Sequence, residues 1–169
     1  MLEIRPEKPT DYAEVYQVNA QAFNRTNEAE LVDNLRPVVQ PYISLVAEIE
    51  GRIVGHIFFS PVSIESQAGP QTAMGLGPMA VLPTYQNQGI GTELVQAGLE
   101  ACRQQGHKLV VVLGHPGFYP RFGFIPAGSL GLRFHEPIPE EAFMLLELSP
   151  GTPVEANAVV RYHPEFDHI

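Results

Sequence analysis

The chain has 169 residues, a formal net charge of −9 and a single cysteine, Cys102. This length fits one folded domain with a substantial core, and a lone cysteine excludes an intrachain disulfide and fits a reducing compartment. The acidic balance argues against binding to a nucleic-acid backbone, and no apolar run approaches the ~20 residues needed to span a bilayer. We therefore expect a soluble, cytoplasmic protein that works without nucleic acid or membrane.

The first part of the chain predicts three strands and two helices. Residues 2–5 alternate apolar with polar and predict a short strand. Apolar residues at helical spacing predict a helix over 10–23 and a second over 28–36, which a proline then ends. Strands are expected over 43–48 and 52–60, joined by a Glu-Gly turn as a hairpin.

The middle of the chain predicts a strand, a helix and a second strand. The first strand, 72–81, contains Gly77 and Pro78, which weaken ladder pairing and suggest a bulge or a splayed edge. An amphipathic helix is expected from residue 90 to about 105, and the continuous apolar run 109–113 predicts a buried central strand. This order makes one βαβ unit whose two strands are parallel.

The last part predicts strands at 124–125 and 142–148, followed by a proline-bearing extended tail over 149–169. Antiparallel strands early and a βαβ unit late indicate an α+β fold. Its sheet is expected to be mixed and mostly antiparallel, flanked by helices, with one splayed strand pair. We expect one domain over 1–169, with its core within about 2–148.

The turn between the strand 72–81 and the following helix is rich in glycine. It reads Gln-Asn-Gln-Gly-Ile-Gly-Thr over 86–92. Gly89 and Gly91 remove side chains where the unpaired amides and dipole of a helix start favour an anion such as phosphate. A Rossmann site is disfavoured because its third glycine falls on Leu94, and no Gly-Lys-Ser/Thr follows for a P-loop. The alternative is a helix start that binds nothing.

A second motif follows the central strand. Residues 114–124 read Gly-His-Pro-Gly-Phe-Tyr-Pro-Arg-Phe-Gly-Phe, with Tyr119 before an Arg-Phe-Gly-Phe turn. Together the two motifs resemble the GNAT superfamily of acetyl-CoA-dependent N-acetyltransferases, over roughly residues 2–148. The resemblance implies a GNAT-like fold and acetyl-CoA as acyl donor. It also implies a coenzyme site formed by Met79, Ala80, Val81, Gln86, Asn87, Gln88, Gly89, Ile90, Gly91, Thr92, Gly114 and Tyr119.

The chemistry of acetyl transfer assigns roles to two of these residues. A neutral amine attacks the thioester, so an oxyanion and then a thiolate form. The resemblance makes the Met79 N–H the candidate oxyanion donor and Tyr119 the candidate general acid that protonates the sulfur. The alternative for Tyr119 is an aromatic anchor that packs beside Phe118 and Phe122.

The sequence departs from the family at the general base. Some members place a glutamate on the bulged strand, where this chain has Gly-Leu-Gly over 75–77. A base could act through water, come from elsewhere or be unnecessary. The candidates, each with a structural or solvated role as its alternative, are Glu28, Glu30, Asp33, His56 and His115.

The leading hypothesis is an N-acetyltransferase that acts on a small amine or a protein amino group. A non-catalytic acyl-CoA-binding module is the alternative from another class, and a nucleotide-binding domain is a third. Acceptor loops are expected in 24–40 and 128–139. Six histidines without zinc spacing predict no metal, Cys102 is expected in the core, and a homodimer is possible.

Overall fold

A computed structural model describes residues 1–169. The first half holds β1 (Leu2–Pro6), α1 (Tyr12–Phe23), α2 (Asn27–Leu35), β2 (Ile43–Ile49), β3 (Arg52–Glu65) and β4 (Gln71–Val81). The second half holds α3 (Ile90–Gln104), β5 (Leu109–Leu113), β6 (Ile125–Pro126), β7 (Arg133–Phe134), β8 (Phe143–Glu147) and β9 (Val159–Arg161). The predicted α+β class and the predicted order of elements up to β5 are confirmed.

The chain folds into two compact units. The first contains residues 1–60, 77–101 and 164–169, and the second contains 61–76 and 102–163. The long strand β3 and strand β4 each contribute residues to both units.

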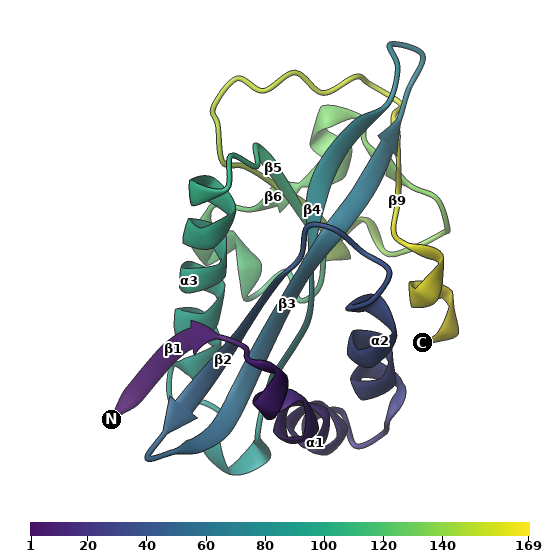
Figure 1. The fold of residues 1–169 in the computed structure, drawn as a ribbon. Helices are drawn as coiled ribbons and strands as arrows, with labels where there is room; N and C mark the ends of the chain where they lie inside the picture. The colour runs from purple at the N-terminus through teal and green to yellow at the C-terminus, as the bar shows by residue number, and fades with distance from the viewer. The chain divides into compact units, whose positions relative to one another are not determined.

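In the first unit, β1 pairs antiparallel with β2, and β2 pairs antiparallel with β3. The predicted hairpin is confirmed, with Glu50 at φ 49° and Gly51 at φ 78° in its turn. Helix α3 covers one face of these strands and α1 covers the other, as Figure 1 shows. Successive side chains of β3 point to opposite faces, so Phe59 meets α3 whereas His56 meets α1.

Helix α1 begins later than the sequence predicts. Residues 9–11 form a 3-10 turn, and α1 starts at Tyr12 with Asp11 as its N-cap. The Asp11 carboxylate accepts a hydrogen bond from the Lys8 N–H and two from the Arg5 guanidinium. These bonds hold the turn against β1, and helix propensity alone does not include such a constraint from a neighbouring strand.

In the second unit, β4 pairs parallel with β5, so the predicted βαβ topology is confirmed. Strand β8 pairs antiparallel with both β5 and β6, which makes the sheet mixed and mostly antiparallel, as predicted. The β4–β5 pairing ends at Leu76 opposite Val112. The next residue is Gly77, at φ +134°. The pairing of β4 with β5 therefore ends at the Gly77-Pro78 step, where the sequence predicts a bulge or a splayed edge.

The prediction of an extended tail over 149–169 is wrong in its second half. Strand β9 pairs antiparallel with β3 and parallel with β7, and the last residues, Pro164–His168, form a 3-10 helix that contacts α2. Ala158, Val160 and Tyr162 are buried, which is the alternation of a strand with one buried face. The prolines on either side of this short run hid the pattern.

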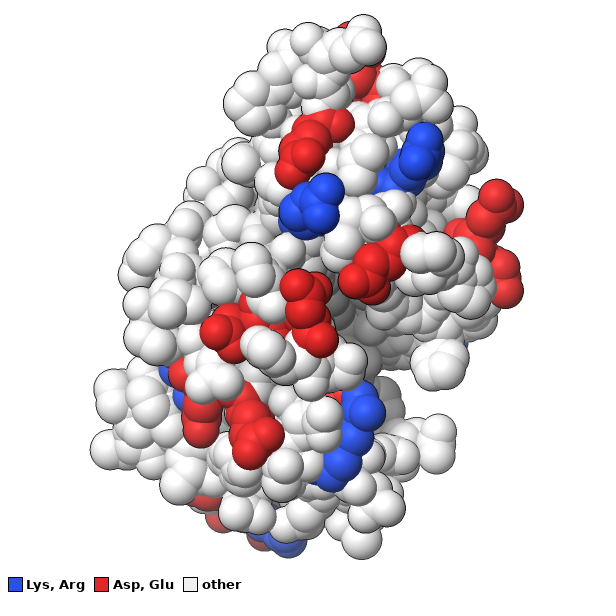
Figure 2. All heavy atoms as spheres, turned by 90° about the vertical axis from the view of Figure 1, so that its right-hand side faces the viewer, with Lys and Arg blue, Asp and Glu red and all other residues white.

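None of the helices is both long enough and apolar enough to cross a lipid bilayer. Figure 2 shows acidic and basic side chains interspersed on the face it draws, with no continuous basic patch there.

Candidate active site

The glycine turn of the first unit forms an open helix start. Gly89 has φ +85°, and a Cβ atom added there would meet nothing within 4 Å. The Glu93 N–H donates to the Gly89 carbonyl at 3.1 Å, so the first bond of α3 closes on Gly89. Asn87 also has positive φ, at 62°. The loop thus turns sharply twice and leaves space in front of the helix.

The amides of Ile90, Gly91 and Thr92 belong to the first turn of α3, where N–H groups have no partner within the helix. Such amides, together with the helix dipole, favour an anion at this end. The side-chain amides of Gln86 and Gln88 donate to the Val81 and Thr84 carbonyls at 2.9 and 3.3 Å. These two glutamines therefore brace the loop, which supports the prediction that the backbone supplies the anion binding.

Close packing fixes the position of α3 on β3. A Cβ atom at Gly98 would lie 2.2 Å from Cε1 of Phe59, so only glycine lets the helix approach this ring. A Cβ atom at Gly55 would lie 3.0 Å from Cδ1 of Leu94, which occupies the place of a Rossmann motif's third glycine. Leu94 is a buried packing residue here.

The end of β4 presents a regular strand edge in the first unit. Buried and half-exposed positions alternate over residues 78–82, with Met79 and Val81 half-exposed and Ala80 buried between them. The Leu82 N–H donates to the Val54 carbonyl of β3 at 2.8 Å. Met79 and Val81 therefore share one face, as a strand that pairs with an extended ligand requires.

In the second unit, Tyr119 begins a 3-10 helix, Tyr119–Phe122, and its side chain is buried. Its ring lies against Gly114, where a Cβ atom would come within 2.3 Å of Cε2. Burial raises the pKa of Tyr119 to about 12. The phenol is therefore protonated at neutral pH and can act as a proton donor.

Aromatic rings surround Tyr119. Phe118 and Phe124 contact its ring edge to face, with centroids 5.0 and 5.8 Å away, and Phe122 lies at 6.5 Å. The packing predicted for Tyr119 beside Phe118 and Phe122 is therefore confirmed. Its role as a general acid stays a prediction, which this packing accommodates because a fixed ring presents its hydroxyl in one direction.

The predicted coenzyme-site residues fall into two groups. Residues 79–81 and 86–92 lie in the first unit, whereas Gly114 and Tyr119 lie in the second. That both groups serve one ligand stays a prediction from the order of the motifs.

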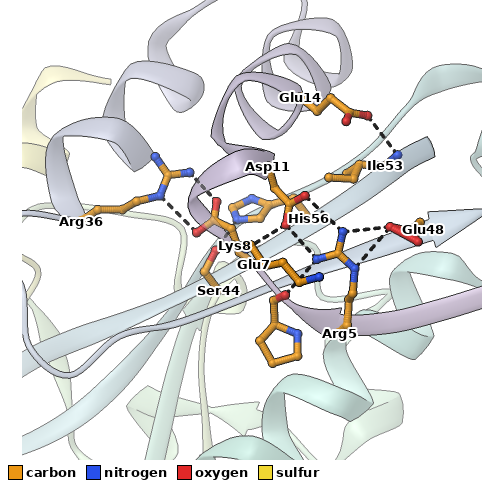
Figure 3. Close-up of polar contacts among 11 residues, drawn as sticks. Arg5, Glu7, Lys8, Asp11, Glu14, Arg36, Ser44, Glu48, Ile53 and His56 are labelled. Atoms are coloured by element: carbon orange, nitrogen blue, oxygen red, sulfur yellow. Dashed lines mark hydrogen bonds and ion pairs between the residues drawn. The ribbon is translucent and has the colours of Figure 1, made fainter. Parts of the chain in front are cut away.

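Of the candidate bases, His56 has a structural role. Its Nδ1 atom accepts from the Asn19 amide nitrogen at 3.1 Å, so Nε2 carries the proton and donates to Ser44 Oγ at 2.8 Å. Figure 3 shows the ring enclosed between α1 and the strands. Burial, and secondly the charge of Arg36, lower its pKa to about 3. A histidine that is neutral and fully buried here cannot take up a proton readily.

The other candidate bases are paired or exposed. Glu28 is buried and bonded to Arg25, and Asp33 pairs with Arg36 at 2.6 Å. Glu30 and His115 are exposed side chains. Two of these four side chains are held by arginines and two face solvent, and nothing marks any of them as the general base.

Two groups of ion pairs that the sequence did not reveal lie beside the ends of β1, α1 and α2 (Figure 3). Arg5 bridges Asp11 at 2.7 Å and Glu48 at 2.8 Å. Arg36 donates from Nε to the buried Glu7 carboxylate at 3.1 Å. The Arg5 pairs join the turn before α1 to β1 and β2, and the Arg36 pair joins the end of α2 to the residue after β1.

A cavity of about 650 Å³ lies in the second unit, within the segment predicted to carry an acceptor loop. Phe134 and Phe143 form its apolar wall, with ring centroids 5.6 Å apart, and Glu136 and Glu140 contribute carboxylates. Phe143 is the register partner of Leu113 at the end of β5, and the Gly114 N–H donates to the Ala142 carbonyl at 2.9 Å. The cavity thus adjoins the end of β5, where the Tyr119 ring lies against Gly114.

Cys102 is fully buried, and burial raises its pKa to about 12, so this thiol is a core residue as predicted. Tyr162 is a second buried tyrosine, which the sequence analysis missed. The only signal in the sequence is that Tyr162 continues the series of alternate apolar residues Ala158 and Val160.

A family model described as an acetyltransferase (GNAT) domain matches residues 3–127. The uncharacterized N-acetyltransferase YhbS of Escherichia coli strain K12 is 34% identical over 167 residues, which cover 98% of this chain and 99% of that protein. The uncharacterized N-acetyltransferase YjhQ of the same organism is 39% identical over 135 residues, which cover 78% of this chain and 75% of that protein.

Solved structures show the same likeness. A GNAT family acetyltransferase from Brucella melitensis, in complex with acetyl-CoA, matches with a TM-score of 0.80 and 38% identity over 99% of both chains. The E. coli YhbS structure in complex with CoA matches with a TM-score of 0.86 and 34% identity over 98% of this chain and 92% of that one. This chain belongs to the GNAT acetyltransferase family.

Proposed function

We propose that residues 1–169 act as one acetyl-CoA-dependent N-acetyltransferase domain, which transfers the acetyl group to a primary amine by direct attack. The observation that carries this proposal is the open turn at Gly89, with the unpartnered first-turn amides of α3 behind it. Two related proteins whose structures contain acetyl-CoA or CoA support the same ligand. The amides of residues 90–92 would bind the diphosphate of the coenzyme.

The remaining predicted residues have roles that follow from the reaction. The backbone of residues 79–81 would pair with the pantetheine arm, and the Met79 N–H would meet the oxyanion. Tyr119, which is buried and protonated, would give its proton to the departing sulfur. The amine would attack in its neutral form and lose its proton to water, since no side chain is assigned as base.

The acceptor is proposed to be a small molecule or a protein amino group that enters beside the cavity at Phe134 and Phe143. The cavity adjoins the end of β5 and offers carboxylates that suit a cation. We further propose that the enzyme works in the cytoplasm, where its single thiol stays reduced.

The release of CoA thiol from acetyl-CoA across a panel of amines tests this function. We expect amine-dependent release by the wild-type protein and a loss of about 10²-fold or more in Tyr119→Phe. Binding of acetyl-CoA with no turnover on any amine would contradict the transferase and favour a non-catalytic acyl-CoA-binding module. Stabilisation by ATP or NAD but not by CoA would favour a nucleotide-binding domain.

A further inference from the structure

Arg121, in the 3-10 helix Tyr119–Phe122, contacts the turn that leads into that helix. Its Nε atom donates to the Phe118 carbonyl at 2.9 Å, and its Nη2 atom donates to the Gly117 carbonyl at 3.3 Å. The guanidinium carbon also lies 4.6 Å from the centroid of the Phe118 ring, which makes a cation–π contact. One side chain thus binds both the backbone and the ring of the residue before Tyr119.

Phe118 connects Arg121 to Tyr119. The rings of Phe118 and Tyr119 meet edge to face with centroids 5.0 Å apart, and the Phe118 ring contacts Phe122 in the same way at 5.2 Å. The N–H groups of Phe118 and Tyr119 both donate to the His115 carbonyl, at 3.0 and 3.4 Å. A movement of Phe118 would therefore disturb both the backbone and the ring of Tyr119.

The turn itself has little packing to hold it. Residues 115–117 are exposed, and a Cβ atom at Gly117 would meet nothing within 4 Å. The strand end before the turn is fixed, because the Gly114 N–H donates to the Ala142 carbonyl at 2.9 Å. The Arg121 hydrogen bonds thus act on the part of this segment that packing leaves least constrained.

We propose that Arg121 is a positioning residue that acts through Tyr119: its guanidinium holds the turn 115–119 closed and so keeps the Tyr119 ring in place against Gly114. This inference rests on the proposed function, in which Tyr119 protonates the departing sulfur. Two carbonyls and a ring face suit the planar, forked donors of an arginine, which a lysine ammonium does not offer. Position 121 therefore contributes geometry, and its charge alone does not suffice.

Two variants separate geometry from charge. Arg121→Met and Arg121→Lys both remove the forked donors, and only the lysine keeps the charge. We expect kcat to fall about five- to tenfold in both with the Kd of acetyl-CoA unchanged, because a misplaced acid slows proton transfer and not binding. In a Tyr119→Phe background neither change should lower kcat further. A wild-type kcat in either variant, or equal losses in both backgrounds, would overturn the inference.

Hydrogen exchange tests the same contact without turnover. In Arg121→Met the Phe118 and Tyr119 amides should exchange about fivefold faster, the factor for one lost exposed hydrogen bond. The amide of Val111, in the buried strand β5, should not change. Arg161→Met, which removes another exposed arginine, should keep the wild-type exchange and kcat.

Unchanged exchange of the Phe118 and Tyr119 amides in Arg121→Met would overturn the inference. A wild-type protein that acetylates no amine would contradict the proposed function instead. In that case the exchange rates would still decide whether Arg121 holds the turn.

Discussion

The ring of Tyr119 rests on the backbone of Gly114 so closely that one added methyl group would overlap it, with Cβ only 2.3 Å from Cε2. Gly114 has no positive φ, so alanine would be tolerated by the backbone itself and would act only by displacing the ring. Glycine at the end of β5 thus sets the position of the candidate acid.

Gly114→Ala should therefore impair catalysis more than coenzyme binding. We expect kcat to fall about 10- to 100-fold through misplacement of Tyr119, and unfolding in urea to show a loss of about 1–3 kcal/mol from overpacking. Gly117→Ala is the matched control, since a Cβ atom there meets nothing within 4 Å. A kcat equal to that of the control would exclude a positional role for Gly114.

Phe134→Ala tests whether the cavity of the second unit receives the acceptor. Removing the Phe134 ring should raise the KM for an amine substrate about tenfold, which corresponds to the loss of one aromatic contact. The Kd of acetyl-CoA should not change. Phe134→Leu, which keeps an apolar side chain in the cavity, should have a smaller effect. If steady-state kinetics give the same KM for all three proteins, the acceptor binds elsewhere.

His56 should make the fold sensitive to acid. Its pKa is about 3 in the folded protein, against an ordinary value of 6.5. As the pH falls from 6.5 to 3, His56 is therefore protonated in the unfolded chain but stays neutral in the folded protein. The free energy of unfolding should fall by about 1.4 kcal/mol per pH unit between these values from this group alone. Urea denaturation from pH 7 to 4 measures it.

His56→Gln should flatten that slope, even though it also loses the hydrogen bonds to Asn19 and Ser44. His168→Gln, a change at an exposed side chain, should keep the slope of the wild-type protein. An unchanged slope in His56→Gln would show that other groups carry the acid sensitivity.

Glu7→Gln tests the buried ion pair with Arg36, whose side chains are 3% and 8% exposed. Without the Glu7 charge, the remaining partners of the Arg36 guanidinium are the Asp33 carboxylate and the face of the Tyr12 ring. We expect a loss of about 3 kcal/mol by chemical denaturation, the lower end for one partner of a buried pair. Asp33→Asn removes the exposed partner of the same arginine and should cost less than about 1 kcal/mol. Equal losses would mean that burial of Glu7 contributes little.

The sequence predicted the parts of this fold that depend on neighbouring residues. The Glu50-Gly51 turn, the end of α2 before Pro37 and the glycine turn before α3 are local features, and each lies where it was predicted. The apolar run of β5 indicated its central place in the same way.

What the sequence did not reveal depends on contacts between separate elements. The start of α1 at Tyr12 follows from the bonds of Asp11 to Arg5, and β9 exists because its three residues pair with β3. The contact of Tyr162 with Gly75 joins residues far apart in the chain, and neither residue carries a local signal for the other. The sequence therefore predicted the turns of the candidate site but not its packing.

Titration calorimetry with acetyl-CoA tests the central claim, that backbone amides at the start of α3 bind the coenzyme. Gly89→Glu and Gly51→Glu form a matched pair, because both glycines have positive φ, at 85° and 78°, and both have open space around a Cβ atom. Both variants carry the same strain and charge, but only Gly89→Glu places a carboxylate before the amides. We predict tight binding by the wild-type protein and by Gly51→Glu, and affinity at least about tenfold weaker in Gly89→Glu. No heat from the wild-type protein, or equal affinity in both variants, would contradict the account.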